Sequence, residues 1–340
     1  MPAKASSGAS FESSTIRKVP LTSLHPTATE HKVERRNAAS GAGAALTPLH
    51  LWHLASFDAP TVALVWASSF TWAVGTHLPP QAAAVIALGV WTVYVADRLL
   101  DARSALRHDA EYRLRERHYF HWRHRKVLVP FALVAGVAVA ILVLACIPVV
   151  ARERDSVLAV ASLAYFARVH QRELSAVRGR RPFFPPMITK ELLVGVLFAV
   201  GCALPALGAA WAAAAISRWV LMGCVAFFAA LAWLNCHAIE QWESEAGPEP
   251  GTLGGSDLSL ARLAFGLASI SLLAAVLLCR AHPRPALLLA AAAISALLIA
   301  LLDRMRTRLN PLTLRAAADV VLLAPALVIL VAGPIAGLVR

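Results

Sequence analysis

The stretch Val90-Trp-Thr-Val-Tyr-Val-Ala-Asp97-Arg-Leu-Leu-Asp101-Ala-Arg103 ends an apolar segment that begins at about Ala82. It places two carboxylates, Asp97 and Asp101, four residues apart, so a helix puts both on one face, one turn apart. A charged residue at bilayer depth costs roughly 2.5–3.5 kcal/mol, so these two acids require a cation, a basic side chain or water nearby. The spacing therefore predicts half of a divalent-metal site at the end of a membrane helix.

The composition of the whole chain is that of a membrane protein. Of its 340 residues, 58% are hydrophobic and 15% are charged, and the mean hydropathy is +0.63. A soluble domain of this length would be less apolar. The formal net charge of +12 lies mainly between the apolar runs, so it indicates membrane topology and not nucleic-acid binding.

Nine apolar runs predict an all-α, polytopic bundle of about nine transmembrane helices, most of them near the ~20 residues that a bilayer requires. The expected spans cover residues 60–75, 82–97, 127–150, 155–169, 188–208, 217–239, 259–279, 284–302 and 316–338. Residues 1–50 are rich in Ser, Ala, Thr and Gly, which is typical of a disordered tail. The sequence thus predicts a tail followed by one membrane domain, residues 51–340.

Lysine and arginine are unevenly distributed among the connecting segments. They are concentrated in the N-terminal tail and after the second, fourth and eighth spans. By the positive-inside rule these segments face the cytoplasm. We therefore expect an integral, multi-pass protein, with its N-terminus cytoplasmic and its C-terminus outside, in a bacterial inner membrane.

A second acidic cluster ends the sixth expected span. Glu240 and Glu243 are three residues apart, on one helical face, and Asn235 and His237 are polar residues within the preceding apolar run. The topology puts this cluster on the same side of the membrane as Asp97. Carboxylates of two helix ends would suit Mg²⁺, which commonly binds one or two carboxylates together with substrate phosphates.

These motifs resemble those of the UbiA superfamily of intramembrane prenyltransferases, over roughly residues 51–340. Asp97-Arg-Leu-Leu-Asp101 looks like the end of the family's first motif, Asn-Asp-x-x-Asp-x-x-x-Asp, although Val93 and Tyr94 replace its leading Asn and Asp. Glu240-Gln-Trp-Glu243 stands where the second, Asp-x-x-x-Asp-like motif belongs. The resemblance implies nine helices around a central cavity that opens to the cytoplasmic side.

The resemblance also implies a mechanism. A prenyl diphosphate would bind through Mg²⁺ to the catalytic and metal-binding residues Asp97, Asp101, Glu240 and Glu243, and its prenyl group would be transferred to a lipophilic or aromatic acceptor. The candidate substrate-binding residues are Asn235, His237, Arg98, Tyr165, Arg168 and Lys190. Aromatic rings could shield the allylic cation by cation–π contact, and the rings eligible for this are Trp66, Trp72, Trp91 and Tyr165.

Two alternatives remain open. The same bundle would serve as a non-catalytic membrane scaffold or as a transporter, although carriers favour helices broken at the bilayer midplane. His118, His121 and His124 are spaced by three and would form a metal-binding face, but a basic, aromatic interfacial helix is the simpler interpretation. We also expect Asp319, inside the last span, to pair with Arg315 at i−4.

Overall fold

The computed structural model describes residues 47–107, 116–176, 190–211, 215–245 and 260–338. The chain divides into two units, Met1–Leu46 and Thr47–Arg340, and every described residue belongs to the second. Within these ranges there is no strand, which confirms the all-α prediction. The expected tail, residues 1–50, lies outside the described residues except for residues 47–50.

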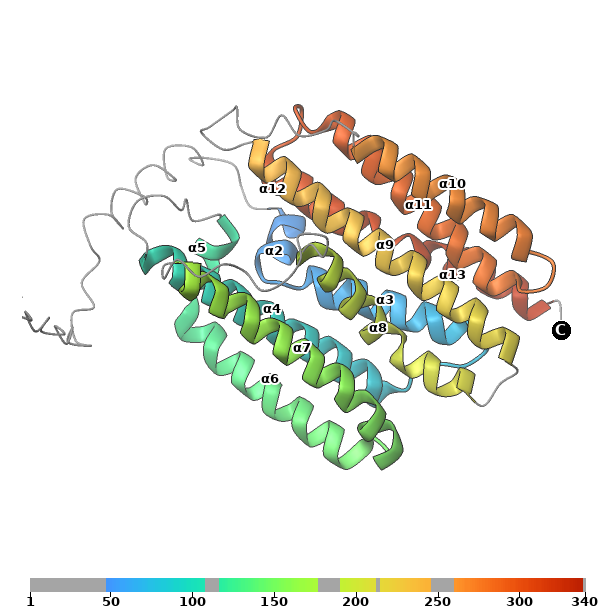
Figure 1. The fold of residues 1–340 in the computed structure, drawn as a ribbon, viewed down its shortest axis with the longest axis horizontal. Helices are drawn as coiled ribbons and strands as arrows, with labels where there is room; N and C mark the ends of the chain where they lie inside the picture. Colours follow the sequence, from blue (N-terminus) through green and yellow to red (C-terminus); the bar gives the residue numbers. More distant parts are fainter. Residues whose placement is uncertain (1–46, 108–115, 177–189, 212–214, 246–259, 339–340) are drawn as a thin grey trace, which may run out of the picture. The chain divides into compact units, whose positions relative to one another are not determined.

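The helices of the second unit lie roughly alongside one another (Figure 1). They are α2 (Pro48–Leu54), α3 (Asp58–Ala73), α4 (Pro80–Arg107), α5 (Glu116–Arg123), α6 (Arg125–Cys146), α7 (Val149–Ala176), α8 (Lys190–Trp211), α9 (Ala215–Glu245), α10 (Leu260–Leu278), α11 (Pro283–Met305), α12 (Pro311–Val321) and α13 (Ala324–Leu338). The most extensive pairings are α10 with α11, α8 with α9, and α4 with α6, while α3 packs against both α4 and α8. This arrangement brings α3 and α9 together in the interior.

Among the described helices, six are long and apolar enough to cross a membrane, namely α4, α6, α8, α9, α10 and α11. The bent pair α12–α13 makes a seventh if it is counted as one span. The helix α3 has 16 residues, fewer than the ~20 that a bilayer requires. The helix α7 carries Arg152, Glu153 and Asp155 near its start, which lowers its mean hydropathy.

Large apolar side chains are exposed along α6 and α10. Leu133 and Val134 of α6 are 66% and 68% exposed, and Leu277 of α10 is 72% exposed. Water-soluble proteins rarely expose contiguous apolar faces of this kind, whereas lipid chains solvate them without cost. Together with the long apolar helices, these faces indicate an integral, multi-pass membrane protein.

The interior is built from stacked aromatic rings and small residues. The rings of Trp66 and Phe228 are stacked 3.8 Å apart between α3 and α9, and Phe70 meets Phe228 edge-on. Gly195 lets α8 approach α9 closely, since a Cβ atom there would lie 2.9 Å from the backbone nitrogen of Trp233. Small residues at helix contacts are typical of bundles in membranes, where close packing holds the helices together.

The last span is broken between α12 and α13, which are bent by 40°. The break frees backbone carbonyls that the apolar interior cannot hydrate. Trp66 Nε1 donates to the Leu322 carbonyl at 2.9 Å, and Ser295 Oγ donates to the Val321 carbonyl at 2.6 Å. Side chains of α3 and α11 thus satisfy the backbone at the break, and they fix the position of α12 in the bundle.

Candidate functional site

Three charged residues of the acidic motif lie towards the end of α4. The Arg98 side chain is buried in the bundle, whereas those of Asp97 and Asp101 are partly exposed. Arg98 is 6% exposed, and its guanidinium donates to the His53 carbonyl at 2.9 Å and to Asp58 Oδ2 at 3.3 Å. Asp97 and Asp101 are half-buried, and Asp101 Oδ2 lies 3.7 Å from His118 Nε2. The helical register explains this difference, because Arg98 shares the inner face of α4 with Val95 and Ala102, both fully buried.

The second acidic pair is split by burial. Glu240 is exposed, whereas the Glu243 side chain is only 3% exposed. Glu243 Oε1 lies 2.7 Å from Arg315 Nη2 and 3.3 Å from Arg117 Nη1. The Glu243 carboxylate is therefore held between two guanidinium groups, one from α12 and one from α5.

The short helix α5 joins the two acidic helix ends. Its consecutive residues Arg117 and His118 contact Glu243 of α9 and Asp101 of α4 respectively. His121 fixes α5 to the turn between α2 and α3: its Nδ1 donates to the Arg117 carbonyl at 2.8 Å, so its Nε2 accepts from Ser56 Oγ at 3.0 Å. Asp101 and Glu243 therefore lie at the same end of the helices.

A further cluster of polar groups lies behind Arg98. His53 Nδ1 is 2.7 Å from Asp58 Oδ2 and 3.3 Å from Asp319 Oδ2, and Asn235 Nδ2 donates to Asp319 Oδ1 at 3.2 Å. Three ligand atoms, one from each of His53, Asp58 and Asp319, lie within 4.8 Å of one another. We call these three residues the His53 triad.

The His53 triad also sets the protonation of its histidine. Burial alone would lower the pKa of His53, which lies in the short helix α2 outside the apolar spans. Close contacts and charge interactions with Asp319 and Asp58 outweigh burial, and the pKa of His53 is raised above its ordinary value. A protonated His53 would balance part of the negative charge of the two carboxylates.

The sequence did not predict the roles of His53 and Asp58. The available signal was Asp58 itself, a carboxylate at the very start of an apolar run, which needs a partner for the same reason as Asp97. The expected pairing of Asp319 with Arg315 is wrong. Arg315 pairs with Glu243 instead, and Asp319 pairs with His53.

Of the other predicted substrate-binding residues, the structure describes the side chains of Asn235 and His237, and these two have different partners. Asn235 is 4% exposed and bonds Asp319, while His237 stacks on the Trp233 ring with centroids 5.6 Å apart. The side chains of Tyr165, Arg168 and Lys190 lie outside the described residues.

The aromatic residues proposed to shield a cation have separate places in the bundle. Trp66 belongs to the packed interior, and Trp91 Nε1 donates to the Ala55 carbonyl at 3.1 Å. The Arg284 guanidinium carbon lies over the Trp72 ring, 5.6 Å from the centroid of that ring.

The three histidines in and just after α5 do not share a metal-binding face. His118 contacts Asp101, His121 bonds Ser56, and His124 Nδ1 bonds the Phe120 carbonyl at 2.8 Å. Because each histidine has its own partner, the structure favours α5 as a basic, aromatic connector between helix ends.

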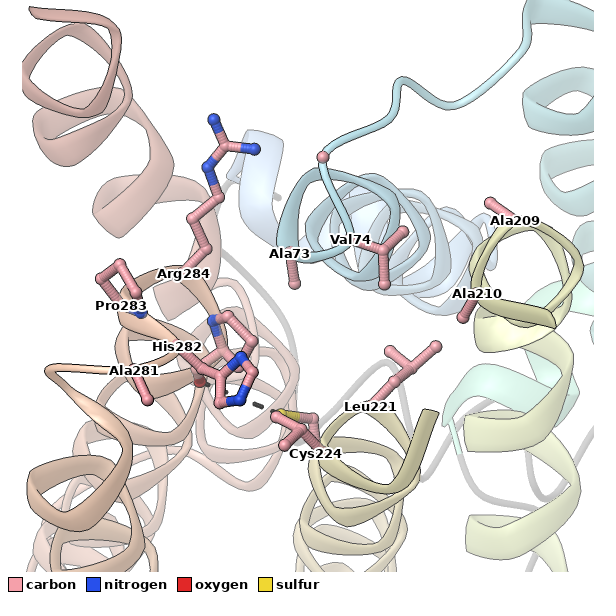
Figure 2. A pocket seen from close by; sticks show the side chains of 13 residues that line it. Ala73, Val74, Ala209, Ala210, Leu221, Cys224, Ala281, His282, Pro283 and Arg284 are labelled. Atoms are coloured by element: carbon pink, nitrogen blue, oxygen red, sulfur yellow. Dashed lines mark hydrogen bonds between the residues drawn. The ribbon is translucent and has the colours of Figure 1, made fainter. Parts of the chain in front are cut away.

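Two pockets lie at opposite ends of the helices. One, of about 290 Å³, is lined by Trp242, Glu243, Arg306 and Arg315 and lies beside the ion pairs described above. The other, of about 390 Å³, lies where α3, α8, α9 and α11 meet, and Figure 2 shows His282, Arg284 and Cys224 around it. The first pocket combines two guanidinium groups and the Glu243 carboxylate with apolar side chains such as Leu309 and Leu314.

Comparisons of this chain with protein-family models, with curated proteins and with solved structures found no match.

Proposed function

We propose that this chain is an intramembrane prenyltransferase, which transfers a prenyl group from a prenyl diphosphate to a lipophilic or aromatic acceptor. The position of α5 is the observation that supports this function best. Through Arg117 and His118 it contacts both Glu243 and Asp101, so carboxylates and guanidinium groups gather at one end of apolar helices. A prenyl diphosphate has a multiply charged head and an apolar tail, and this end of the bundle offers a matching surface to each.

Asp97 and Asp101 fit a magnesium ion best among the four predicted ligands. Both are hard oxygen donors, one helical turn apart and partly exposed. Glu243 fits less well as a ligand because Arg117 and Arg315 already hold its carboxylate, whereas Glu240 is exposed at the same helix end and remains a proposed ligand. When bound, Mg²⁺ would neutralise negative charge on the leaving diphosphate.

The cationic side chains have distinct tasks in this mechanism. Glu243 positions Arg117 and Arg315, and a guanidinium has five N–H donors, so each arginine can bind Glu243 and a diphosphate oxygen together. Such contacts orient the head group and stabilise the charge that develops as the C–O bond breaks. Arg98 is enclosed by Asp58 and the His53 carbonyl, so we assign it a positioning role.

The proposed topology follows from the same assignment. The end of the helices that carries Asp97 and Glu243 would face the cytoplasm of a bacterial cell, with the protein in the inner membrane. The bundle would use nine spans, including α3 and α7, around a central cavity that admits the prenyl chain. The N-terminus would be cytoplasmic and the C-terminus outside.

A non-catalytic scaffold or transporter is the second candidate. It is favoured by the mutual neutralisation of charged groups at this end. Arg98 pairs with Asp58, Arg315 with Glu243, and Arg306 Nη1 with Asp303 Oδ1 at 2.9 Å. A scaffold would use these pairs to hold helix ends together, and it would need no diphosphate.

The two candidates differ in one measurement, which is Mg²⁺-dependent release of pyrophosphate. The full chain, purified in detergent, is incubated with geranyl, farnesyl or geranylgeranyl diphosphate and a phenolic acceptor, with Mg²⁺ or with EDTA. We expect release with Mg²⁺ only, and Asp97→Asn and Asp101→Asn to lower its rate on the order of 100-fold. Glu153→Gln, which changes an exposed carboxylate at the start of α7, serves as the matched control. If the wild type and Asp97→Asn are equally inactive, the scaffold is the better description.

A further inference from the structure

We propose that the His53 triad binds a divalent transition-metal ion such as Zn²⁺, at a site separate from the proposed magnesium ligands. Its three residues come from α2, the start of α3, and α12. The side chains of His53 and Asp58 are 2% and 3% exposed, and that of Asp319 is 17% exposed, so an ion would enter past Asp319. An ion there would join α2 and the start of α3 to α12, which lie far apart in the sequence.

The distances between the ligand atoms suit a shared ion. Zinc binds imidazole nitrogen and carboxylate oxygen at about 2.1 Å, which places neighbouring ligand atoms about 3.0–3.4 Å apart. In the structure His53 Nδ1 lies 2.7 Å from Asp58 Oδ2 and 3.3 Å from Asp319 Oδ2. All three ligand atoms lie within 4.8 Å of one another, so a local rearrangement of the two carboxylates would bring them to coordination distance of one centre.

Hydrogen bonding alone leaves this cluster under-satisfied. His53 Nδ1 carries at most one hydrogen, yet two carboxylate oxygens approach it. Among the described residues, neither ring nitrogen of His53 has a hydrogen bond of good geometry, and Asn235 Oδ1 has none either, although His53 and Asn235 are 1% and 4% exposed. Buried polar atoms without partners are costly, and an unplaced ion or water is a usual explanation.

Asn235 offers a fourth ligand. Its amide group contacts Asp319, with Nδ2 3.2 Å from Asp319 Oδ1. If an ion binds Asp319, exchanging the nitrogen and oxygen of the amide would give up this hydrogen bond and direct Oδ1 to the cluster. One nitrogen and up to three oxygen donors then form the site. Imidazole favours Zn²⁺ or Co²⁺ over Mg²⁺, which prefers oxygen ligands alone.

The charge of Arg98 is compatible with a bound ion. Its guanidinium lies 3.3 Å from Asp58 Oδ2 and is also anchored by the His53 carbonyl. A carboxylate offers about four lone-pair positions, so Asp58 can accept from Arg98 and bind a metal at once. A divalent ion would neutralise the two carboxylates and replace the proton of His53.

The test is metal binding by the full chain, purified in detergent without a polyhistidine tag and stripped with EDTA. Bound Zn²⁺ is measured by mass spectrometry after dialysis, and Co²⁺ is followed by its visible absorption, which reports nitrogen and oxygen ligands. We expect one equivalent of Zn²⁺ and a Co²⁺ spectrum that Zn²⁺ abolishes. His53→Gln and Asp319→Asn should weaken binding at least about 10-fold.

Two matched variants separate this site from others. His237→Gln removes a histidine that stacks on Trp233, and Asp97→Asn removes a proposed magnesium ligand, so both should keep the Zn²⁺ equivalent. Zn²⁺ binding unchanged in Asp319→Asn, or a wild type that binds none, would overturn the proposal. Because Asp319→Glu keeps a carboxylate, it should retain part of the affinity, which shows that a loss in Asp319→Asn is not a folding defect. Pyrophosphate release is not part of this readout, so failure of the proposed enzymatic function would leave the result intact.

Discussion

Glu243 Oε1 lies 2.7 Å from Arg315 Nη2, and this contact joins the end of α9 to α12. The two side chains are 3% and 13% exposed, so the pair is largely removed from water. Removing one partner of such a pair leaves a buried charge with less compensation, which commonly costs more than the pair itself contributes. The contact therefore has a direct consequence for stability.

We predict that Arg315→Gln lowers the free energy of unfolding in detergent by about 3 kcal/mol. Arg117 still contacts Glu243 in this variant and limits the loss. The measurement is a denaturant titration, with Arg308→Gln, an exposed arginine in the turn between α11 and α12, as the control. In the double variant with Glu243→Gln the loss should be smaller than the sum of the single losses. Additive losses would show that the two residues do not interact.

The break between α12 and α13 leads to a second prediction. Trp66→Phe keeps most of the stacking on Phe228 but removes the donor to the Leu322 carbonyl. Ser295→Ala removes the donor to the Val321 carbonyl. Each change leaves a buried carbonyl without its partner, so each should destabilise the fold by about 1–3 kcal/mol. Thermal unfolding measures this, with Trp219→Phe as the control because Trp219 is 72% exposed. If Trp66→Phe unfolds at the same temperature as the control, the bond makes no contribution.

The close approach of α8 to α9 leads to a third prediction. A methyl group at Gly195 would meet the backbone of Trp233 at 2.9 Å and the Ala229 carbonyl at 3.0 Å, and backbone atoms cannot move aside cheaply. Gly195→Ala should therefore cost about 1–3 kcal/mol of stability. Gly223→Ala and Gly266→Ala are matched controls, since nothing lies within 4 Å of the added atom at either position. Those two changes should be neutral or stabilising by up to about 1 kcal/mol, as alanine is the better helix former. Equal behaviour of all three variants would rule out a tight contact at Gly195.

Helix positions could be predicted from the sequence because they depend on local composition. Each expected apolar run overlaps a described helix or, for residues 316–338, the bent pair α12–α13, although six of the described helices, or seven spans with the bent pair, are long and apolar enough to cross a membrane. The break itself had a local signal in Pro325, since the residue before a proline is biased away from helical geometry. The local sequence did not indicate that Trp66 and Ser295 would bond the carbonyls at the break, because those contacts depend on how the helices pack.

The candidate site could be predicted only in part for the same reason. The i, i+4 spacing placed Asp97 and Asp101 together because it is a property of one helix. The partners of Glu243 and Asp319 depend on the rotation of α5, α9 and α12 about their axes, which periodicity does not determine. Arg315 was expected to pair within its own helix, but Glu243 of α9 is nearer to its guanidinium and takes the contact.

The fourth prediction concerns pH and His121, which lies in α5 outside the apolar spans. Burial lowers the pKa of His121 to about 4, and the positive charge of Arg98 adds to this despite the hydrogen bond to the Arg117 carbonyl. An unfolded histidine has a pKa of about 6.5, so between these values the unfolded chain binds a proton that the folded chain does not. The contribution of the neutral His121 to the free energy of unfolding is therefore complete above about pH 6.5. As the pH falls towards 4, this free energy decreases by on the order of 3 kcal/mol.

The effect of His121 on the pH dependence of stability has to be measured by comparing variants, because His53 changes that pH dependence in the opposite direction. The raised pKa of His53 contributes stability at low pH that is lost as the pH rises through its folded value. We therefore compare the thermal midpoint between pH 7 and pH 4.5 in the wild type, in His121→Gln and in His124→Gln, which changes an exposed histidine. The acid loss should persist in His124→Gln and be smaller in His121→Gln, because glutamine does not titrate. An equal acid loss in both variants would mean that His121 is protonated in the folded protein, and it would contradict the hydrogen bond from Ser56 to its Nε2.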